Sequence, residues 1–305
     1  MIKRAVKAAF HAAGGMSVAR WANRARPRIL MYHRFAERDA IARQCAHIRK
    51  YYTPVSLGQV SEWLMAGGGW PDNALAVTVD DGYRDFYQVA YPVFREYEIP
   101  ATVYLVSDFL DRRLWLWVDR VRWAYLNSEA AAGSRPERLR MAQERIEAAK
   151  RMKNQERLEW LDRLPGELKV RIPEEAPEEY GALRWGEVRD AAQNGMEFGA
   201  HTRTHPILSM VEGERELRDE IGGSKRRIEE ELGRAVNHFC YPNGSVQDFS
   251  AAAVEVVRAA GFRTATTTER GFVTAKADAL RLRRIGVEPG LDEQYFAECA
   301  AGLRG

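Results

Sequence analysis

A regular alternation of short apolar runs and longer amphipathic stretches constrains the fold of this chain more than any other feature. Runs that predict strands occur at 28–32, 74–79, 102–106, 196–200, 236–240, 262–267 and 282–287. Patterns typical of helices lie between most of them, at 41–51, 56–66, 83–97, 185–193, 212–232 and 247–260. Strands that alternate with helices predict a parallel sheet, which is either open or closed into a barrel. A strand count of about seven favours the barrel, so we predict an α/β barrel.

The segment at about 108–180 interrupts the alternation. Three tryptophans at 115, 117 and 123 begin a helical stretch, a charged helix is expected over 135–164, and an acidic, proline-containing connector follows. We predict a helical insertion between two strands of one barrel domain that spans 28–305. A separate small domain is the alternative.

Residues 1–27 form a basic leader without an acidic residue. Ile2, Val6 and Phe10 recur at four-residue spacing, which would give one apolar helix face with basic flanks. Polar residues and the Gly14-Gly15 pair interrupt every apolar run, so a secretory signal is not expected. Two interpretations stay open: a helix on an anionic membrane surface, or a solvated leader that packs on the domain. Both predict a cytoplasmic protein, and the first places it on the inner face of the membrane.

Composition excludes some classes of function. A net charge of +3 argues against a dedicated nucleic-acid binder. The 3 cysteines are widely spaced and form neither a disulfide framework nor a C-x-x-C metal site.

Reactive side chains follow several predicted strands. Asp80-Asp81-Gly82 follows the run at 74–79, a His-Thr-Arg-Thr-His segment (201–205) follows 196–200, Tyr-Pro-Asn-Gly (241–244) follows 236–240, and His33 follows 28–32. Groups at the carboxyl ends of parallel strands converge on one face, where active sites form. We therefore expect these segments to meet in one site.

Two imidazoles and a carboxylate form a metal-binding set that suits zinc or another divalent transition ion. His201 and His205 stand four residues apart, on a helical turn or in a tight loop. Either Asp80 or Asp81 could be the carboxylate ligand, and its neighbour could act as a base. Gly82 permits the sharp turn that such a pair requires.

At these residues the chain resembles the polysaccharide deacetylase family, the nodulation-factor deacetylase homology group of carbohydrate esterases. The motifs are TVDDG at 78–82, HTRTH at 201–205 and FCYPNG at 239–244. The resemblance implies a distorted (β/α)₇ barrel and hydrolysis of N-acetyl groups on the aminosugars of an oligosaccharide, polysaccharide or glycolipid. It implies Asp80 as the general base, Asp81, His201 and His205 as the ligands of a divalent ion such as Zn²⁺, and the Asn243 N–H as an oxyanion donor.

Two positions depart from the family pattern. Cys240 stands where the family has an arginine that holds the base aspartate, and Arg283 or Arg284 is the hypothetical substitute. No histidine follows His238 to serve as the leaving-group acid. ILMYHRF at 29–35 resembles a branch in which the N-terminal strand supplies that histidine, which makes His33 the candidate.

Two other functions remain open. The basic leader favours a deformylase or deacetylase of a lipid-linked aminosugar at the membrane, and the two departures leave room for a non-catalytic glycan-binding relative.

Overall fold

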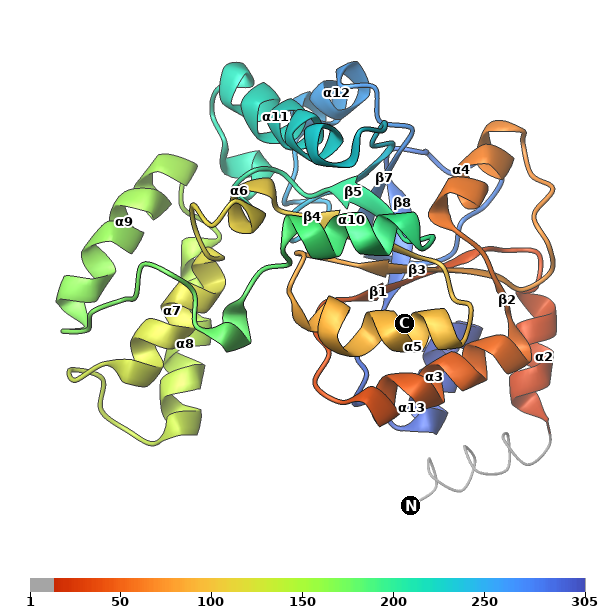
Figure 1. Ribbon diagram of the computed structural model, residues 1–305, viewed down its shortest axis with the longest axis horizontal. Coiled ribbons are helices and arrows are strands. Elements are labelled where there is room, and N and C mark those ends of the chain that lie inside the picture. The colour runs from red at the N-terminus through yellow and green to blue at the C-terminus, as the bar shows by residue number, and fades with distance from the viewer. Residues whose placement is uncertain (1–13, 305) are drawn as a thin grey trace.

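The computed structural model describes residues 14–304 and shows parallel strands surrounded by helices (Figure 1). The strands are β1 (Arg28–Tyr32), β2 (Thr53–Pro54), β3 (Ala74–Val79), β4 (Ala101–Leu105), β5 (Glu197–Ala200), β6 (His238–Cys240), β7 (Thr264–Arg270) and β8 (Leu282–Gly286). The helices of the barrel part are α2 (Gly15–Ala22), α3 (Arg38–Tyr51), α4 (Leu57–Met65), α5 (Tyr91–Glu96), α6 (Ser107–Leu110), α10 (Trp185–Gln193), α11 (Glu214–Leu232), α12 (Ala251–Ala259) and α13 (Glu293–Ala301).

The barrel closes because β1 lies between β3 and β8. The strand order is β1-β8-β7-β6-β5-β4-β3-β2, and β1 also pairs with β3 along its whole length. All pairs are parallel, and β2 is a short strand outside the ring on β3. The expected distorted (β/α)₇ barrel is thereby confirmed.

The strands are buried on both faces, as their near-continuous apolar sequences require. The predicted strands at 28–32 and 74–79 agree with β1 and β3, and the predicted helix at 185–193 agrees with α10. Ser56 caps α4 through a reciprocal bond with Gln59. The Gly222-Gly223 pair does not interrupt α11, which is continuous over 19 residues.

Two predicted helices differ from the structure. The charged helix expected over 135–164 is two helices, α8 (Arg135–Ala149) and α9 (Asn154–Glu167). Where the second helix begins, the Glu156 side chain accepts a 3.3 Å hydrogen bond from the Lys153 backbone N–H. The helix expected over 83–97 starts with a π-helical turn, Phe86–Ala90, before α5.

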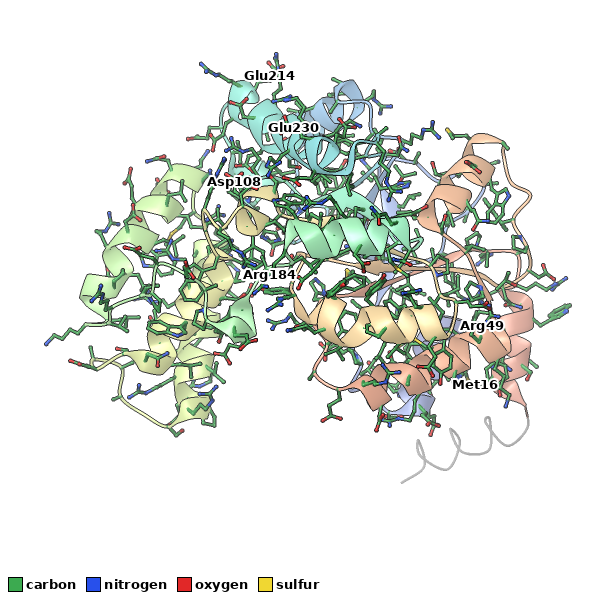
Figure 2. All side chains as sticks on the ribbon, in the orientation of Figure 1. Met16, Arg49, Asp108, Arg184, Glu214 and Glu230 are labelled. Atoms are coloured by element: carbon green, nitrogen blue, oxygen red, sulfur yellow. The ribbon has the colours of Figure 1, made fainter. Side chains whose placement is uncertain are left out.

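The helices α7 (Trp117–Asn127), α8 and α9 lie between β4 and β5 in the chain and project to one side of the barrel (Figure 1). They have a small core of their own, formed by residues such as Trp117, Val121, Ile146 and Leu164. Asp108 and Arg184, labelled in Figure 2, mark where the chain leaves the barrel and returns to it.

The part of the leader that the structure describes includes α2, which packs on α13 and buries Gly15 and Ala19. Asn23, just after it, donates a hydrogen bond to the Ala301 carbonyl, 3.1 Å away. The apolar face expected from Ile2, Val6 and Phe10 lies outside the described residues. None of the described helices has both the length and the apolar character needed to cross a membrane.

Candidate active site

The two aspartates follow β3, and their backbone turns sharply to separate their side chains. Asp81 has φ +75° and Gly82 has φ +79°, both in the left-handed region. Aspartate tolerates this region better than most residues. A Cβ on Gly82 would lie 3.0 Å from the Leu105 side chain, so a larger residue would also crowd β4. The turn directs Asp80 into the barrel and Asp81 into a pocket.

The two site histidines come from a tight loop after β5, rather than from a helical turn. Thr202 and His205 both have positive φ, +67° and +59°. A β-branched residue in this region is strained and needs support from its surroundings. Glu220 of α11 provides it by accepting hydrogen bonds from the backbone N–H groups of Arg203 and Thr204, each 2.9 Å. The loop is therefore held in one conformation from outside.

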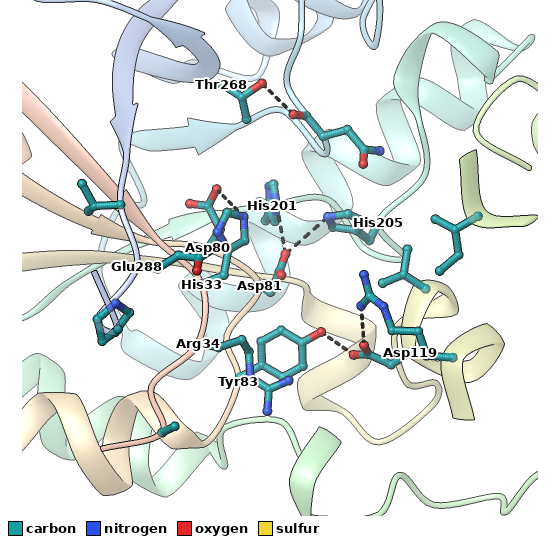
Figure 3. A pocket seen from close by; sticks show the side chains of 18 of the residues that line it. His33, Arg34, Asp80, Asp81, Tyr83, Asp119, His201, His205, Thr268 and Glu288 are labelled. Carbon is teal, nitrogen blue, oxygen red and sulfur yellow. Dashed lines mark hydrogen bonds and ion pairs between the residues drawn. The ribbon is translucent and has the colours of Figure 1, made fainter. Parts of the chain in front are cut away.

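Asp81, His201 and His205 form a compact cluster (Figure 3). The Nε2 atoms of both histidines lie 3.4 Å from Asp81 Oδ1, and the ligand atoms of all three residues lie within 4.8 Å of one another. Burial raises the pKa of Asp81, but hydrogen bonds from the two imidazoles outweigh it and hold that pKa well below its usual range. Burial also lowers the pKa of His205, which favours the neutral form that a metal requires.

Neighbouring groups orient one imidazole but not the other. His201 Nδ1 donates to the Cys240 carbonyl over 2.7 Å, which fixes the ring with Nε2 toward Asp81; in the neutral imidazole, Nε2 is then the nitrogen that can bind a metal. The Nδ1 of His205 is buried without a hydrogen-bond partner among the described residues. The donor set of two imidazole nitrogens and one carboxylate oxygen fits a divalent transition ion.

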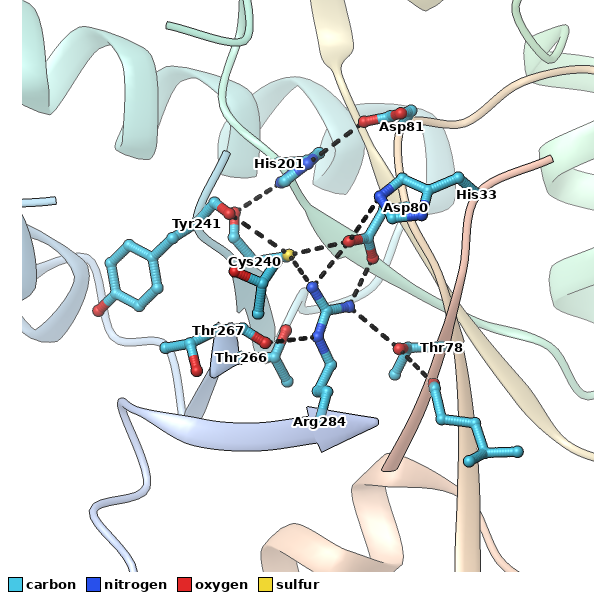
Figure 4. A network of polar contacts seen from close by, with 12 residues as sticks. His33, Thr78, Asp80, Asp81, His201, Cys240, Tyr241, Thr266, Thr267 and Arg284 are labelled. Atoms are coloured by element: carbon cyan, nitrogen blue, oxygen red, sulfur yellow. Dashed lines mark hydrogen bonds and ion pairs between the residues drawn. The ribbon is translucent and has the colours of Figure 1, made fainter. Parts of the chain in front are cut away.

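Asp80 lies in a different environment, inside the barrel (Figure 4). Arg284 of β8 forms a bidentate pair with it, at 2.6 Å to Oδ1 and 2.7 Å to Oδ2. Burial raises the pKa of Asp80, but the Arg284 guanidinium, with His33 and His201, outweighs burial and lowers it. Of the two arginines considered as substitutes, Arg284 makes this contact, whereas Arg283 lies outside it and donates to the Arg270 carbonyl.

Cys240 occupies the neighbouring position on β6. Its sulfur lies 3.1 Å from Arg284 Nη2 and 3.6 Å from Asp80 Oδ2. The small thiol leaves room for a guanidinium that arrives from β8. Arg284 of β8 therefore makes the contact with Asp80 that was expected of an arginine at position 240 on β6.

The remaining predicted residues also reach the site. His33 Nε2 lies 3.7 Å from Asp80 Oδ2, and 46% of the His33 side chain is exposed. Asn243 has φ +58° and its carbonyl accepts a 2.8 Å hydrogen bond from Thr268. Its backbone N–H has no hydrogen-bond acceptor in the described structure and is free to bind a ligand. A pocket of about 840 Å³ is lined by all six predicted site residues: His33, Asp80, Asp81, His201, His205 and Asn243.

The helical insertion forms one wall of this pocket, which the sequence did not indicate. Tyr83, two residues after Asp81, donates a short hydrogen bond to the buried Asp119 of α7. Arg34 stacks on the Tyr83 ring at 4.0 Å, and Arg122 pairs with Asp119 at 3.0 Å. These contacts join the loop that carries the aspartates to the insertion. Arg34 and Tyr83 stand close in sequence to His33 and Asp81, whereas nothing in the sequence links Asp119 to the site.

A sequence profile of the polysaccharide deacetylase family matches residues 68–265, about two thirds of the chain. The chain belongs to the polysaccharide deacetylase family. The match includes both aspartates, the HTRTH loop and Asn243, whereas His33 and Arg284 lie outside it.

Two of the similar proteins are deacetylases by name. Over 74 residues the chain is 34% identical to the poly-β-1,6-N-acetyl-D-glucosamine N-deacetylase of Escherichia coli K12. The matched segment is 24% of this chain but only 11% of that relative. The deacetylase PplD of Streptococcus pyogenes, solved with acetate, has a TM-score of 0.62 at 18% identity and covers 91% of this chain and 99% of its own. IcaB of Ammonifex degensii gives 0.62 at 18%, with 90% and 96% covered. Both solved structures share the fold of this chain.

Proposed function

We propose that this protein is a metal-dependent carbohydrate N-deacetylase that hydrolyses the N-acetyl group of an aminosugar. One observation carries the proposal: adjacent carboxylates face different partners, Asp81 two imidazoles and Asp80 a guanidinium and His33. This separation provides a cation site and a base within one pocket. The family and the name of the Escherichia coli relative support the reaction class.

Asp81, His201 and His205 would hold the ion, and we propose Zn²⁺ because this donor set suits it. When bound, such an ion supplies Lewis acidity, which polarises a carbonyl and lowers the pKa of water toward about 7.

Asp80 accepts the proton of the attacking water in this proposal. Each carboxylate oxygen has two lone pairs; Oδ2 also accepts the Cys240 thiol, so beside the Arg284 fork a lone pair stays free on Oδ1. The lowered pKa keeps Asp80 deprotonated at neutral pH, and the fork fixes its orientation.

Two other groups complete the reaction. The Asn243 N–H would donate to the oxygen of the acetyl carbonyl as negative charge develops there, and one such donor is typically worth about 3–4 kcal/mol. His33 would protonate the departing nitrogen from the open side of the pocket. Water adds to the acetyl carbon, the C–N bond breaks, and acetate and the sugar amine leave.

The test is acid release from metal-loaded protein on a panel of N-acetyl- and N-formylhexosamine oligomers, with and without chelator. We expect acetate release that chelator abolishes and added Zn²⁺ restores. Release of formate alone would redefine the acyl group. Glycan binding without any acid release would make the chain a non-catalytic relative and overturn the proposal.

A further inference from the structure

A groove leads away from the catalytic pocket along α3. A second cavity of about 300 Å³ shares Ala40 and Arg43 with the catalytic pocket as lining residues. Residues of α3 at three- or four-residue intervals line the path, namely Ala40, Arg43, His47 and Lys50, so they lie on one face of the helix. The 14 residues of α3 span about 21 Å. The groove therefore extends well beyond one sugar.

The outer cavity has a mixed lining. Leu291, just before α13, together with Ala46 and Tyr51 of α3, supplies apolar surface, and Gln44, His47 and Glu293 supply polar groups. A hydrocarbon chain could lie on the apolar part of this lining.

Cations gather around the groove. Arg20 of α2 and Lys50 lie over the Tyr51 ring, at 4.2 and 5.1 Å from its centre. Neither these two residues nor Arg43 has an acidic ion-pair partner in the described structure, and Glu293 is the acidic residue that lines the outer cavity. Burial lowers the pKa of His47 to about 4, and the charges of Arg20 and Lys50 add to this effect. An anionic group would be attracted to this path.

Next to Tyr51, which lines the outer cavity, α2 exposes apolar side chains. Val18 and Trp21 are 63% and 64% exposed, while Gly15 and Ala19 on the opposite face are buried. Arg24 lies over the Trp21 ring at 4.5 Å. Tryptophan beside arginine is typical of the membrane interface, where the ring is amphipathic and the cation meets anionic headgroups.

We propose that the substrate is an aminosugar joined through phosphate to a long lipid and presented at a membrane surface. This inference rests on the proposed N-deacetylase function. The sugar occupies the catalytic pocket, and the phosphate lies beside Arg43. The lipid runs along α3 and α13 toward the bilayer, where Arg20 and Lys50 face headgroups and Val18 and Trp21 insert.

Binding of the full chain to vesicles tests this without relying on hydrolysis. The probe is phosphatidylcholine vesicles with and without N-acetylglucosaminyl diphosphoundecaprenol, separated by flotation. We expect the lipid-linked sugar to raise binding at least tenfold. Arg43→Gln should remove most of this gain, and Val18→Ser with Trp21→Ser should weaken binding to both kinds of vesicle. Arg258→Gln, an exposed arginine on α12, is the matched control and should bind like the wild type.

Acetate release then separates the possible substrates. Wild type should deacetylate the vesicle-borne substrate with at least tenfold higher kcat/KM than a soluble N-acetylglucosamine tetramer, and Arg43→Gln should lose more on the former. Equal vesicle binding with and without the lipid-linked sugar would overturn this inference and leave the deacetylase function standing. Uridine diphosphate N-acetylglucosamine is a soluble phosphosugar. If Arg43→Gln loses as much kcat/KM on it as on the vesicle-borne substrate, the protein recognises the phosphate alone and the lipid part is refuted. Vesicle binding without release of acetate from any substrate would instead refute the deacetylase function.

Discussion

Asp80 and Asp81 are neighbours in the chain, yet their side chains have different partners. Asp80 is 2% exposed and its charge is matched by a guanidinium that belongs to the protein. Asp81 faces two imidazoles, which carry no compensating charge when they are neutral. A buried carboxylate with neutral partners needs a cation from elsewhere. The comparison shows that different strands give the same residue type different partners, which suits Asp80 to the proposed role of base and Asp81 to that of ligand.

The largest effect is expected on the Asp81 side. Asp81→Asn keeps the shape and tolerates the positive φ, but it removes the negative charge that an ion requires. We expect bound metal and acetate release to fall to background together, as measured by elemental analysis and an acetate assay. Asp72→Asn, a surface aspartate, is the control. An active, metal-loaded Asp81→Asn variant would remove Asp81 from the ligand set.

The Asp80 side should respond differently. Asp80→Asn removes the proton acceptor, so kcat should fall by about 10²–10⁴, the usual contribution of a general base. Bound metal should stay at the wild-type ratio, because Asp80 is outside the proposed ligand set. Loss of metal in this variant would show that Asp80 also takes part in metal binding, so that the two aspartates do not have separate roles.

His33 tests the open side of the same carboxylate. His33→Ala should lower kcat by about 10²-fold, because solvent reaches the half-exposed position and can partly replace the proton donor. The acidic limb of the pH–rate profile should be retained and the basic limb should be lost. If both limbs persist at wild-type positions, another group donates the proton.

Arg284 should affect activity least and stability most. Because it orients Asp80 without contacting the proposed substrate, Arg284→Lys should lower activity by about 10- to 100-fold. Arg284→Leu leaves a buried carboxylate unpaired, which typically costs about 3–5 kcal/mol, measurable by urea unfolding.

The pH dependence of that stability supplies the second measurement. Since the pKa of Asp80 is lowered in the folded protein, the pair stabilises the fold above the unfolded value of about 3.9. This contribution is lost as pH falls through the folded pKa. Arg284→Leu should abolish this component. Equal acid sensitivity of wild type and Arg284→Leu would show that the pair does not stabilise the fold.

The sequence alone determined much of the barrel and which residues carry chemistry. The apolar runs of β1 and β3 are unambiguous because strands buried on both faces need continuous apolar residues. Asp80, Asp81, His201 and His205 were recognisable because reactive residues after parallel strands must share one face. Helix boundaries were less certain, as the division of 135–164 into α8 and α9 shows.

Only the tertiary structure decided which partner each group has. Arg283 and Arg284 are equivalent by sequence, but alternate residues of a strand point to opposite faces, and the register of β8 turns Arg284 inward. His33 meets Asp80 because β1 pairs with β3, a contact between segments almost fifty residues apart. The Tyr83–Asp119 contact and the groove along α3 likewise depend on packing between distant elements. Local patterns determine elements, whereas the closure of the barrel determines which side chains meet.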